Sequence, residues 1–269
     1  MSLDIDDAFI QEFEAGVHVE YQRMGSMLRG TIRTREGVKN KTTFQIYGKG
    51  TATQKARHSK IPAMNVAHDN VSVTVEDWYA GEWIDDLDTL RINHDEMQEA
   101  QRAGAMALGR KTDEQLVDAM DATTNETDLS ASPTIADILA VMTKMGNREI
   151  PDDGERYWPV TWDFWAKLLQ IKEFASADYV GSDQMPFPRA TTGKRWGSFL
   201  IWPYTGYKQN GASKFKSFAY HRSSTGHAIG EDVTSNIQYH NDMDAFFAMN
   251  KMQMNAVMID ATGIERVLL

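Results

Sequence analysis

The chain has 269 residues, of which 42% are hydrophobic and 25% are charged, an ordinary globular composition with enough length for a sizeable core. It contains no cysteine, which excludes disulfides, thiolate metal sites, iron–sulfur clusters and cysteine nucleophiles. Its net charge of −10 argues against nucleic-acid binding by the whole surface. The acidic N-terminus does not have the pattern of a secretory signal, and no stretch approaches the roughly 20 apolar residues of a membrane helix.

The charge is divided unevenly along the chain. Between Gln22 and Lys60 ten basic residues stand against one acid, Glu36, so this segment carries +9 and the rest of the chain carries −19. A segment of this kind favours an acidic or phosphate-bearing partner, although it can also be a solvated basic surface. Few aromatic residues are interleaved with the charges, which does not favour stacking on nucleic acid. We therefore predict contacts with the acidic surface of another copy of the chain, made by Arg29, Arg33, Arg35, Lys49, Lys55, Arg57 and Lys60.

A dense acidic segment follows. It begins at Glu76 and contains no basic residue before Arg91, and its candidate contact residues are Glu82, Asp85, Asp86 and Asp88. Carboxylates at this density can bind calcium or magnesium, but the segment lacks the glycine-turned spacing of an EF-hand and is interleaved with tryptophan and tyrosine. We interpret it as the acidic face of a packed element and predict no metal site.

The first half of the chain predicts a hairpin that projects from the body. Polar and apolar residues alternate over residues 42–47 and 70–75, as in strands. The residues between them, 48–69, are polar and basic and offer little to bury. Because so long a structureless segment is unusual inside a compact domain, we expect it to reach outward to a partner. Residues 4–17 have helical spacing, and residues 24–35 are predicted as an extended arm.

Three helices are predicted in the middle of the chain. The longest runs over residues 94–122 after the N-cap Asn93, is on the order of 40 Å long, and has small residues at 100–109 that allow strands to approach closely. Ser132-Pro133 is predicted to start a second helix that ends at Gly146. Its predicted buried stripe is Ile135, Ile138, Leu139, Met142 and Met145.

The third helix is predicted to begin after the N-cap Thr161 and to bury Trp162, Trp165, Leu168 and Leu169. Beyond it, residues 197–204, 214–221, 233–240 and 255–260 are predicted as strands, and residues 180–194 as an exposed loop. Helices and strands in this order indicate an α+β fold.

No catalytic or cofactor motif is present. Gly193-Lys194 does not complete a phosphate-binding loop, and the metalloprotease, nucleophile-elbow and EF-hand patterns do not occur. The spacing of His221, Ser223 and Asp232 does not support a catalytic triad, and we interpret the histidines as ordinary residues at strand ends. We predict no catalytic residue, no cofactor and no metal.

The order of these features resembles the major capsid proteins of tailed bacteriophages with the Hong Kong 97 fold. The resemblance covers nearly the whole chain and rests on seven segments. They are GSMLRGTIR (25–33), FQIYGKGTATQKARHSKIPAMNVAHDNVSVTV (44–75), WYAGEWIDDLD (78–88), MQEAQRAGAMALGRKTDEQLVDAM (97–120), ADYVGSDQ (177–184), FAYHRSSTGHAIGEDV (218–233) and NAVMIDATGIERV (255–267).

The resemblance implies a domain organisation. Residues 1–40 would form an N-terminal arm and residues 41–75 the extended hairpin called the E-loop. Residues 76–128 and 241–269 would form a peripheral domain built on a long spine helix, and residues 129–240 an axial domain. The basic arm and hairpin would then lie across the acidic surface of the next subunit.

The resemblance also implies a function. Copies would assemble into pentamers and hexamers of an icosahedral shell that encloses double-stranded DNA without sequence-specific binding, in the host cytoplasm, to become part of the virion. Because the chain starts almost at the arm, we expect a separate scaffolding protein, with a portal and a decoration protein as further candidate partners. Covalent cross-links between subunits are not predicted, because no partner is identified for Lys49, Lys55 or Lys60.

Three alternatives remain open. The chain could be another phage structural component, such as a tail or decoration protein, which does not account for a spine helix between a long hairpin and a late return strand. It could form the shell of an encapsulin-like bacterial compartment, which has the same fold. It could also be a hydrolase that uses His221 or His227, for which the sequence offers no supporting motif.

Overall fold

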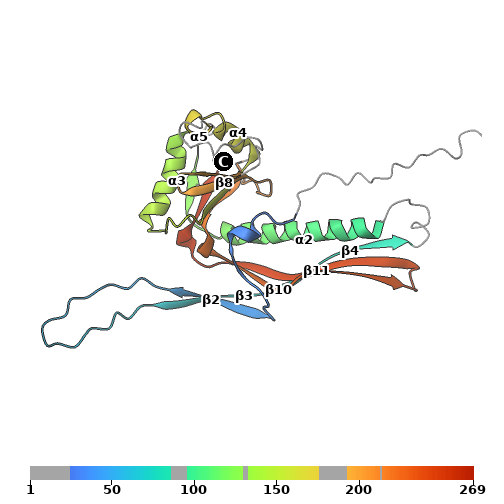
Figure 1. Cartoon of the computed structure of the whole chain (residues 1–269), viewed down its shortest axis with the longest axis horizontal. Helices are drawn as coiled ribbons and strands as arrows, with labels where there is room; N and C mark the ends of the chain where they lie inside the picture. The colour runs from blue at the N-terminus through green and yellow to red at the C-terminus, as the bar shows by residue number, and fades with distance from the viewer. Residues whose placement is uncertain (1–24, 86–95, 130–132, 176–192, 213) are drawn as a thin grey trace, which may run out of the picture.

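The computed structural model describes residues 25–85, 96–129, 133–175, 193–212 and 214–269. These residues form an elongated layer, a compact layer that stands on one end of it, and a two-stranded hairpin that projects beyond that same end (Figure 1). No described helix is long and apolar enough to cross a bilayer.

The elongated layer is a four-stranded sheet with one long helix on it. The strand order is β1 (Arg33–Arg35), β10 (Thr225–His240), β11 (Ala245–Met258) and β4 (Glu76–Asp85). β1 is parallel to β10, and the other neighbours are antiparallel. Helix α2 (Glu96–Asp121) lies along one face of this sheet (Figure 1).

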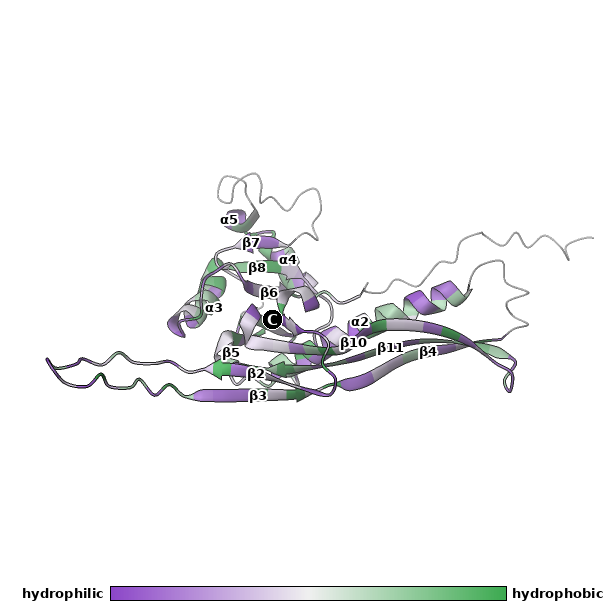
Figure 2. Cartoon of the chain, turned by 60° about the horizontal axis from the view of Figure 1, so that its bottom comes forward, coloured by the Kyte–Doolittle hydropathy of each residue, from purple (hydrophilic) through white to green (hydrophobic). Residues whose placement is uncertain are grey.

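The two faces of this sheet differ because strand residues alternate in direction. Met252 and Met254 of β11 are buried against Leu108 of α2, and Ala248 packs with Ala100. Gly104 allows the closest approach, since a Cβ there would lie 2.1 Å from the amide nitrogen of Asn250. At the end of the sheet remote from the hairpin, no described helix or strand covers the opposite face (Figure 2).

The compact layer is a six-stranded sheet with three helices. The strand order is β5 (Glu126–Asp128), β12 (Ile264–Leu268), β9 (Lys216–His221), β6 (Arg156–Val160), β8 (Phe199–Pro203) and β7 (Lys194–Trp196). The helices are α3 (Ile135–Asn147), α4 (Trp162–Leu168) and α5 (Lys172–Ala175). Trp158, Trp165 and Phe199 are buried together in the core of this layer, which confirms the predicted burial of Trp165.

The hairpin consists of β2 (Lys41–Tyr47) and β3 (His68–Thr74), paired in register from Lys41–Thr74 to Tyr47–His68. Its base is anchored in a small core in which Phe44 and Val73 pack with Ala228. The Phe44 ring lies over Gly226 of β10, where a Cβ would come within 2.6 Å of the ring. The predicted strands, the long loop between them and the long helix are therefore present.

Two helix predictions are wrong in detail. Helix α3 begins after Thr134 rather than at Ser132-Pro133, because Thr134 and Asp137 form a reciprocal capping box. Leu139 is 40% exposed and Val141 is buried instead. Thr161 does cap α4, but Trp162 is 45% exposed, and Phe164 takes the buried position.

Several predicted elements differ in extent, and some lie outside the described residues. The strand predicted from 233 starts at Thr225, the strand predicted from 255 starts at Ala245, and β6 and β12 were not predicted at all. β6 contains Pro159 and has no alternating pattern because it is buried from Trp158 to Val160. The helix predicted at 4–17, the cap Asn93 and most of the loop predicted at 180–194 lie outside the described residues.

The boundaries predicted between layers also change. A boundary between 240 and 241 would separate β10 from β11, which are paired from Thr225–Met258 to His240–Ala245. Strand β12 pairs with β9 in the compact layer rather than with the elongated sheet. The chain crosses between the layers at two short 3-10 turns, η3 (Arg222–Ser224) and η4 (Ala261–Gly263), which contact each other.

We predict that Gly109→Ala in α2 destabilises the fold, although alanine favours a helix by about 1 kcal/mol. A Cβ at Gly109 would lie 2.6 Å from the Cα of Gly25, so the backbone there must shift. We expect urea denaturation of the purified subunit to give a free energy of unfolding lower by about 1–3 kcal/mol.

The matched control is Gly146→Ala in α3, where a Cβ meets nothing within 4 Å. This variant should be neutral or stabilised by up to about 1 kcal/mol. Equal effects of the two substitutions would contradict the close approach of α2 and residue 25.

Candidate assembly surfaces

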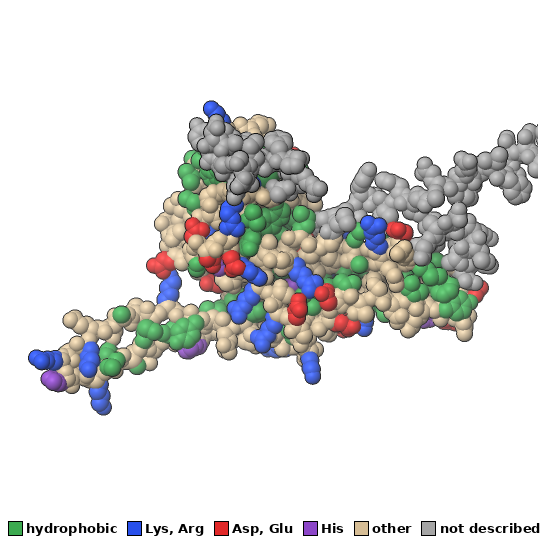
Figure 3. Space-filling view, in the orientation of Figure 1, with side chains coloured by type: hydrophobic (Ala, Val, Ile, Leu, Met, Phe, Trp, Pro, Cys, Tyr) green, Lys and Arg blue, Asp and Glu red, His purple; other side chains and the backbone are tan. Residues whose placement is uncertain are grey.

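The loop between β2 and β3, residues 48–67, is the most exposed part of the described chain. Besides Lys49, it holds three of the predicted contact residues, Lys55, Arg57 and Lys60, all exposed and without an ion pair to any described residue. The chain reverses in a turn at residues 57–59, and His58 there has a φ of 64°. Figure 3 shows the basic side chains gathered at this outer end of the hairpin. The structure therefore presents these cations to solvent.

Lys49, at the start of the loop, is placed differently. Its ammonium group forms an ion pair with Glu149, which follows helix α3 of the compact layer. Both side chains are exposed, and Lys49 lowers the pKa of the Glu149 carboxyl group. Lys49 thus connects the hairpin to its own subunit.

The three predicted arginines at the arm also have partners within the subunit. Arg29 donates two hydrogen bonds to Asp232, at 3.0 and 2.8 Å, and lies 3.5 Å from Glu36. These acids raise the pKa of Arg29. Arg33 lies over the Phe44 ring at 5.6 Å, and Arg35 donates to the carbonyl of Thr43 at 3.3 Å. Alternation along β1 places Arg33 and Arg35 on the same face, and both remain exposed.

The segment predicted as a free extended arm is instead built into the subunit from residue 25 onward. Leu28 and Ile32 are fully buried with Leu116 of α2 and Tyr220 of β9. Asp113, buried in α2, accepts hydrogen bonds from the backbone N–H groups of Met27 and Leu28, at 3.0 and 3.1 Å, and from the Ser26 hydroxyl.

Sequence reasoning missed this anchor. The i, i+4 pair Leu28 and Ile32 was the available signal, but basic neighbours obscure it. Asp113 gave none, because an acid in a predicted helix is ordinarily exposed.

The acidic segment forms strand β4, so its carboxylates do not share one face. Glu82 and Asp85 are exposed at the distal end of the elongated sheet, in register with Ala248 and Ala245. Because strand residues alternate, these two acids point to opposite sides of the sheet, and the prediction of a single acidic face is wrong. Asp86 and Asp88 lie outside the described residues.

Three aromatic side chains gather on the distal end of the sheet face that α2 does not cover. The Trp83 ring lies 4.5 Å from Phe247 and 5.1 Å from His240, and His240 lies 6.3 Å from Phe247. We call Trp83, His240 and Phe247 the distal aromatic cluster. Trp83 is 47% exposed although it belongs to a strand that is paired with β11. The sequence indicated aromatic packing here, but not that the aromatic surface is open.

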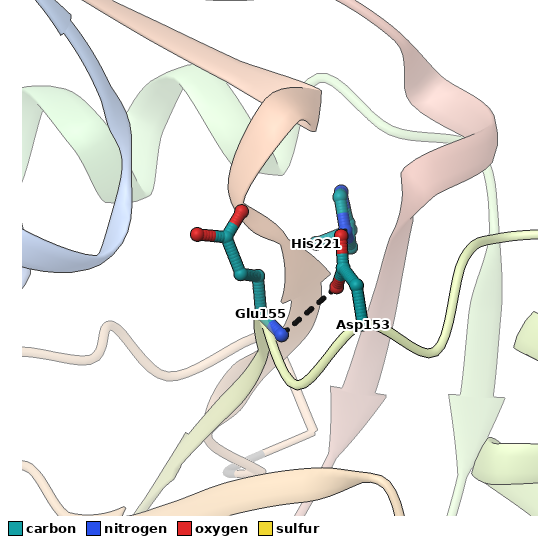
Figure 4. Close-up of side chains that lie close together, drawn as sticks. All are labelled: Asp153, Glu155 and His221. Atoms are coloured by element: carbon teal, nitrogen blue, oxygen red, sulfur yellow. Dashed lines mark hydrogen bonds and ion pairs between the residues drawn. The ribbon is translucent and has the colours of Figure 1, made fainter.

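The one described cluster with the residue types of a metal site lies in the compact layer. Asp153, Glu155 and His221 each bring a ligand atom within 4.8 Å of the others (Figure 4). The His221 ring contacts Asp153 at 3.1 Å, and Arg222 donates to Glu155 at 2.8 Å. The carboxylates thus already have cationic or hydrogen-bonding partners, and the cluster joins the loop before β6 to the end of β9.

The same histidine has a structural use. The Nδ1 atom of His221 accepts a hydrogen bond from the backbone N–H of Ser223 and lies 2.8 Å from its hydroxyl, which caps the turn η3. Asp232, the third residue of the triad that the sequence did not support, pairs with Arg29 instead.

His227 is fully buried in β10, and neither ring nitrogen has a hydrogen-bond partner among the described residues. Burial lowers its pKa to about 4, the Arg29 charge acts in the same direction, and Asp232 opposes it. His227 is therefore neutral near pH 7. In the unfolded chain this histidine binds a proton near pH 6.5. The free energy of unfolding therefore has its full value above that pH and decreases as the pH drops toward 4.

We predict that His227→Leu removes this pH-dependent loss. Between pH 7 and pH 4 the lowered pKa of His227 corresponds to a decrease of about 3 kcal/mol in the free energy of unfolding, which is the most that this histidine can contribute. Urea denaturation at both pH values should show a smaller decrease for the variant than for the parent protein. His68→Leu, at the exposed end of β3, is the control and should keep the parent decrease. Parallel losses in H227L and the parent protein would rule out His227 as the acid-sensitive group.

The model of a family described as phage capsid protein matches residues 5–269. No curated protein matches. Among solved structures, the chain is similar to the capsid of Cyanophage P-SCSP1u at 11% identity, covering 97% of this chain and 93% of that one with a TM-score of 0.74. It is also similar to the mature capsid of bacteriophage PhiM1 at 15% identity, covering 98% of this chain and 92% of that one with a TM-score of 0.72. A third similar structure is that of Mycobacterium phage Che8, at 16% identity, covering 96% of this chain and 97% of that one with a TM-score of 0.71.

Proposed function

The chain belongs to the phage capsid protein family, and from this premise we propose that its copies assemble through their projecting hairpins into the pentamers and hexamers of an icosahedral head shell. It is a major capsid protein, and thus a structural component of the virion. The expected resemblance to tailed-phage capsid proteins and the α+β fold class are confirmed.

The exposed loop 48–67 is the observation that carries the proposal. Its cations Lys55, Arg57 and Lys60 have no ion pair among the described residues, in a chain whose net charge is −10. A loop of this length costs conformational entropy to order, and apart from the Lys49–Glu149 ion pair its side chains are exposed beside the described part of its own subunit. A second copy supplies acidic surface, with Glu82 and Asp85 as candidate partners.

The layers take corresponding roles in this proposal. Residues 1–40 form the N-terminal arm, anchored from residue 25 onward, and residues 41–75 form the E-loop. The elongated sheet with α2 as its spine forms the peripheral domain, and the compact layer forms the axial domain. Exposed ion pairs contribute about 0–1 kcal/mol each, so cohesion comes from their repetition at every interface and from the register that they set.

Further partners belong to the same proposal. The shell assembles in the host cytoplasm with a separate scaffolding protein, encloses double-stranded DNA without reading its sequence, and takes a portal and a decoration protein as candidate components. Its role is structural, and no catalytic step is proposed.

We predict that reversing two loop charges, Arg57→Glu with Lys60→Glu, weakens assembly at least tenfold while the subunit stays folded. Both side chains are exposed and lack a described partner, so their loss leaves the core intact. Electron microscopy and sedimentation measure assembly, and circular dichroism measures folding.

The matched control is Lys167→Glu with Lys172→Glu, which makes the same change of charge on exposed positions of α4 and α5. It should assemble normally. A second experiment mixes the loop variant with a Glu82→Lys, Asp85→Lys variant. If the loop cations face Glu82 and Asp85 of the next copy, the mixture should regain part of the assembly. Normal shells from the loop variant alone would contradict the proposal that the loop charges contribute to assembly.

A further inference from the structure

The two limbs of the hairpin loop differ in chemistry. The outgoing limb, residues 49–60, carries the cations Lys49, Lys55, Arg57 and Lys60. The return limb, residues 61–67, reads IPAMNVA, so Asn65 is its only polar residue. Ile61 is 81% exposed and Met64 is 53% exposed. Single exposed apolar residues are ordinary, but a continuous apolar run on a projecting loop marks a surface that a partner covers.

The opposite end of the subunit presents a surface of matching chemistry. In the distal aromatic cluster Trp83 is exposed and His240 and Phe247 are half-buried, and Met243 in the neighbouring β10–β11 turn is 60% exposed. Asp85 lies on the same face of β4 as Trp83, and Asp242 and Asp244 lie in that turn, so acids border the cluster, whereas Glu82 lies on the opposite face. The Phe247 ring rests on Gly81, where a Cβ would lie 2.5 Å from it, and is tilted by 34° from the Trp83 ring.

One subunit cannot bring these two surfaces together. The loop extends beyond one end of the elongated layer, and the distal aromatic cluster lies at the other end (Figures 1 and 3). Different patches on each partner make a head-to-tail contact, which closes into rings when the rotation between copies permits.

We propose that the return limb, residues 61–67, docks on the distal aromatic cluster of a second copy. The inference rests on the proposed function and specifies the apolar part of that contact. Ile61 and Met64 cover the rings of Trp83 and Phe247, while the basic limb lies over the acidic rim. Large aromatic side chains at the centre of an interface with charges at its edge are the usual arrangement of a strong contact.

The two limbs then have separable roles. Contacts between the basic limb and the acidic rim steer the encounter and weaken as salt rises. The apolar contact persists in sodium chloride and strengthens in sulfate. Assembly should therefore retain a salt-resistant component that depends on Ile61 and Met64.

Cross-linking can test the contact cleanly because the parent chain has no cysteine. Ala63→Cys lies between the two apolar anchors and preserves both. Gln238→Cys is exposed on β10, directly opposite Phe247 in the strand register. The double variant, assembled and treated with a short bis-maleimide, should give a ladder of covalent oligomers. Ala63→Cys with Ala140→Cys, on the exposed side of α3, should give none.

Two outcomes would overturn the proposal. Covalent dimers from Gln238→Cys alone would mean that two clusters face each other, and would overturn the proposal. Assembled double variant without a ladder would overturn it as well.

The apolar contribution has its own test. Ile61→Ser with Met64→Ser should raise the concentration needed for assembly at least tenfold in 0.5 M sodium chloride, the salt chosen at about the level where charge contacts are screened. Leu139→Ser, at an exposed apolar position of α3, should not. Normal assembly of the serine variant, with assembly lost in the charge-reversal variant, would overturn this inference and leave the proposed function standing. Normal assembly of both would overturn both.

Discussion

Packing of helix α2 against the elongated sheet keeps the two ends of the subunit apart, and the rest of the architecture depends on that separation. The small residues Ala100 and Gly104 let the helix lie close to β11, and Leu108 fills the space above Met252 and Met254. A helix seated this closely cannot slide or tilt without overlapping the side chains beneath it. The hairpin base and the distal aromatic cluster are therefore held at fixed positions on one rigid body.

This rigidity explains how an exposed loop can be specific. The loop itself has few contacts, but its base is fixed by paired strands and by Phe44 over Gly226. Only the residues beyond the paired strands must become ordered when a partner binds. The entropic cost of docking is thereby confined to the loop 48–67, while its starting position and direction are set by the fold.

The sequence predicted local features well and long-range pairing poorly. The hairpin, the long helix and the cap at Thr161 follow from alternation, small-residue content and capping chemistry, all of which are local signals. Strands β6 and β12 have no such signal, because both are buried on both faces and their neighbours come from distant parts of the chain. The exposed cations of the loop were predictable from charge alone, whereas Arg29 looked equally available and is bound by Asp232, 203 residues later. The open aromatic surface at Trp83 could not be predicted either, since its exposure depends on what does not pack over β4.

Asp113 fastens the first described residues to the middle of α2, where its carboxylate accepts hydrogen bonds from the backbone N–H groups of Met27 and Leu28. A mechanical load applied to the chain at residue 25 is therefore transmitted to the helix and to the sheet beneath it. The hairpin, which follows β1 in the chain, is shielded from that load.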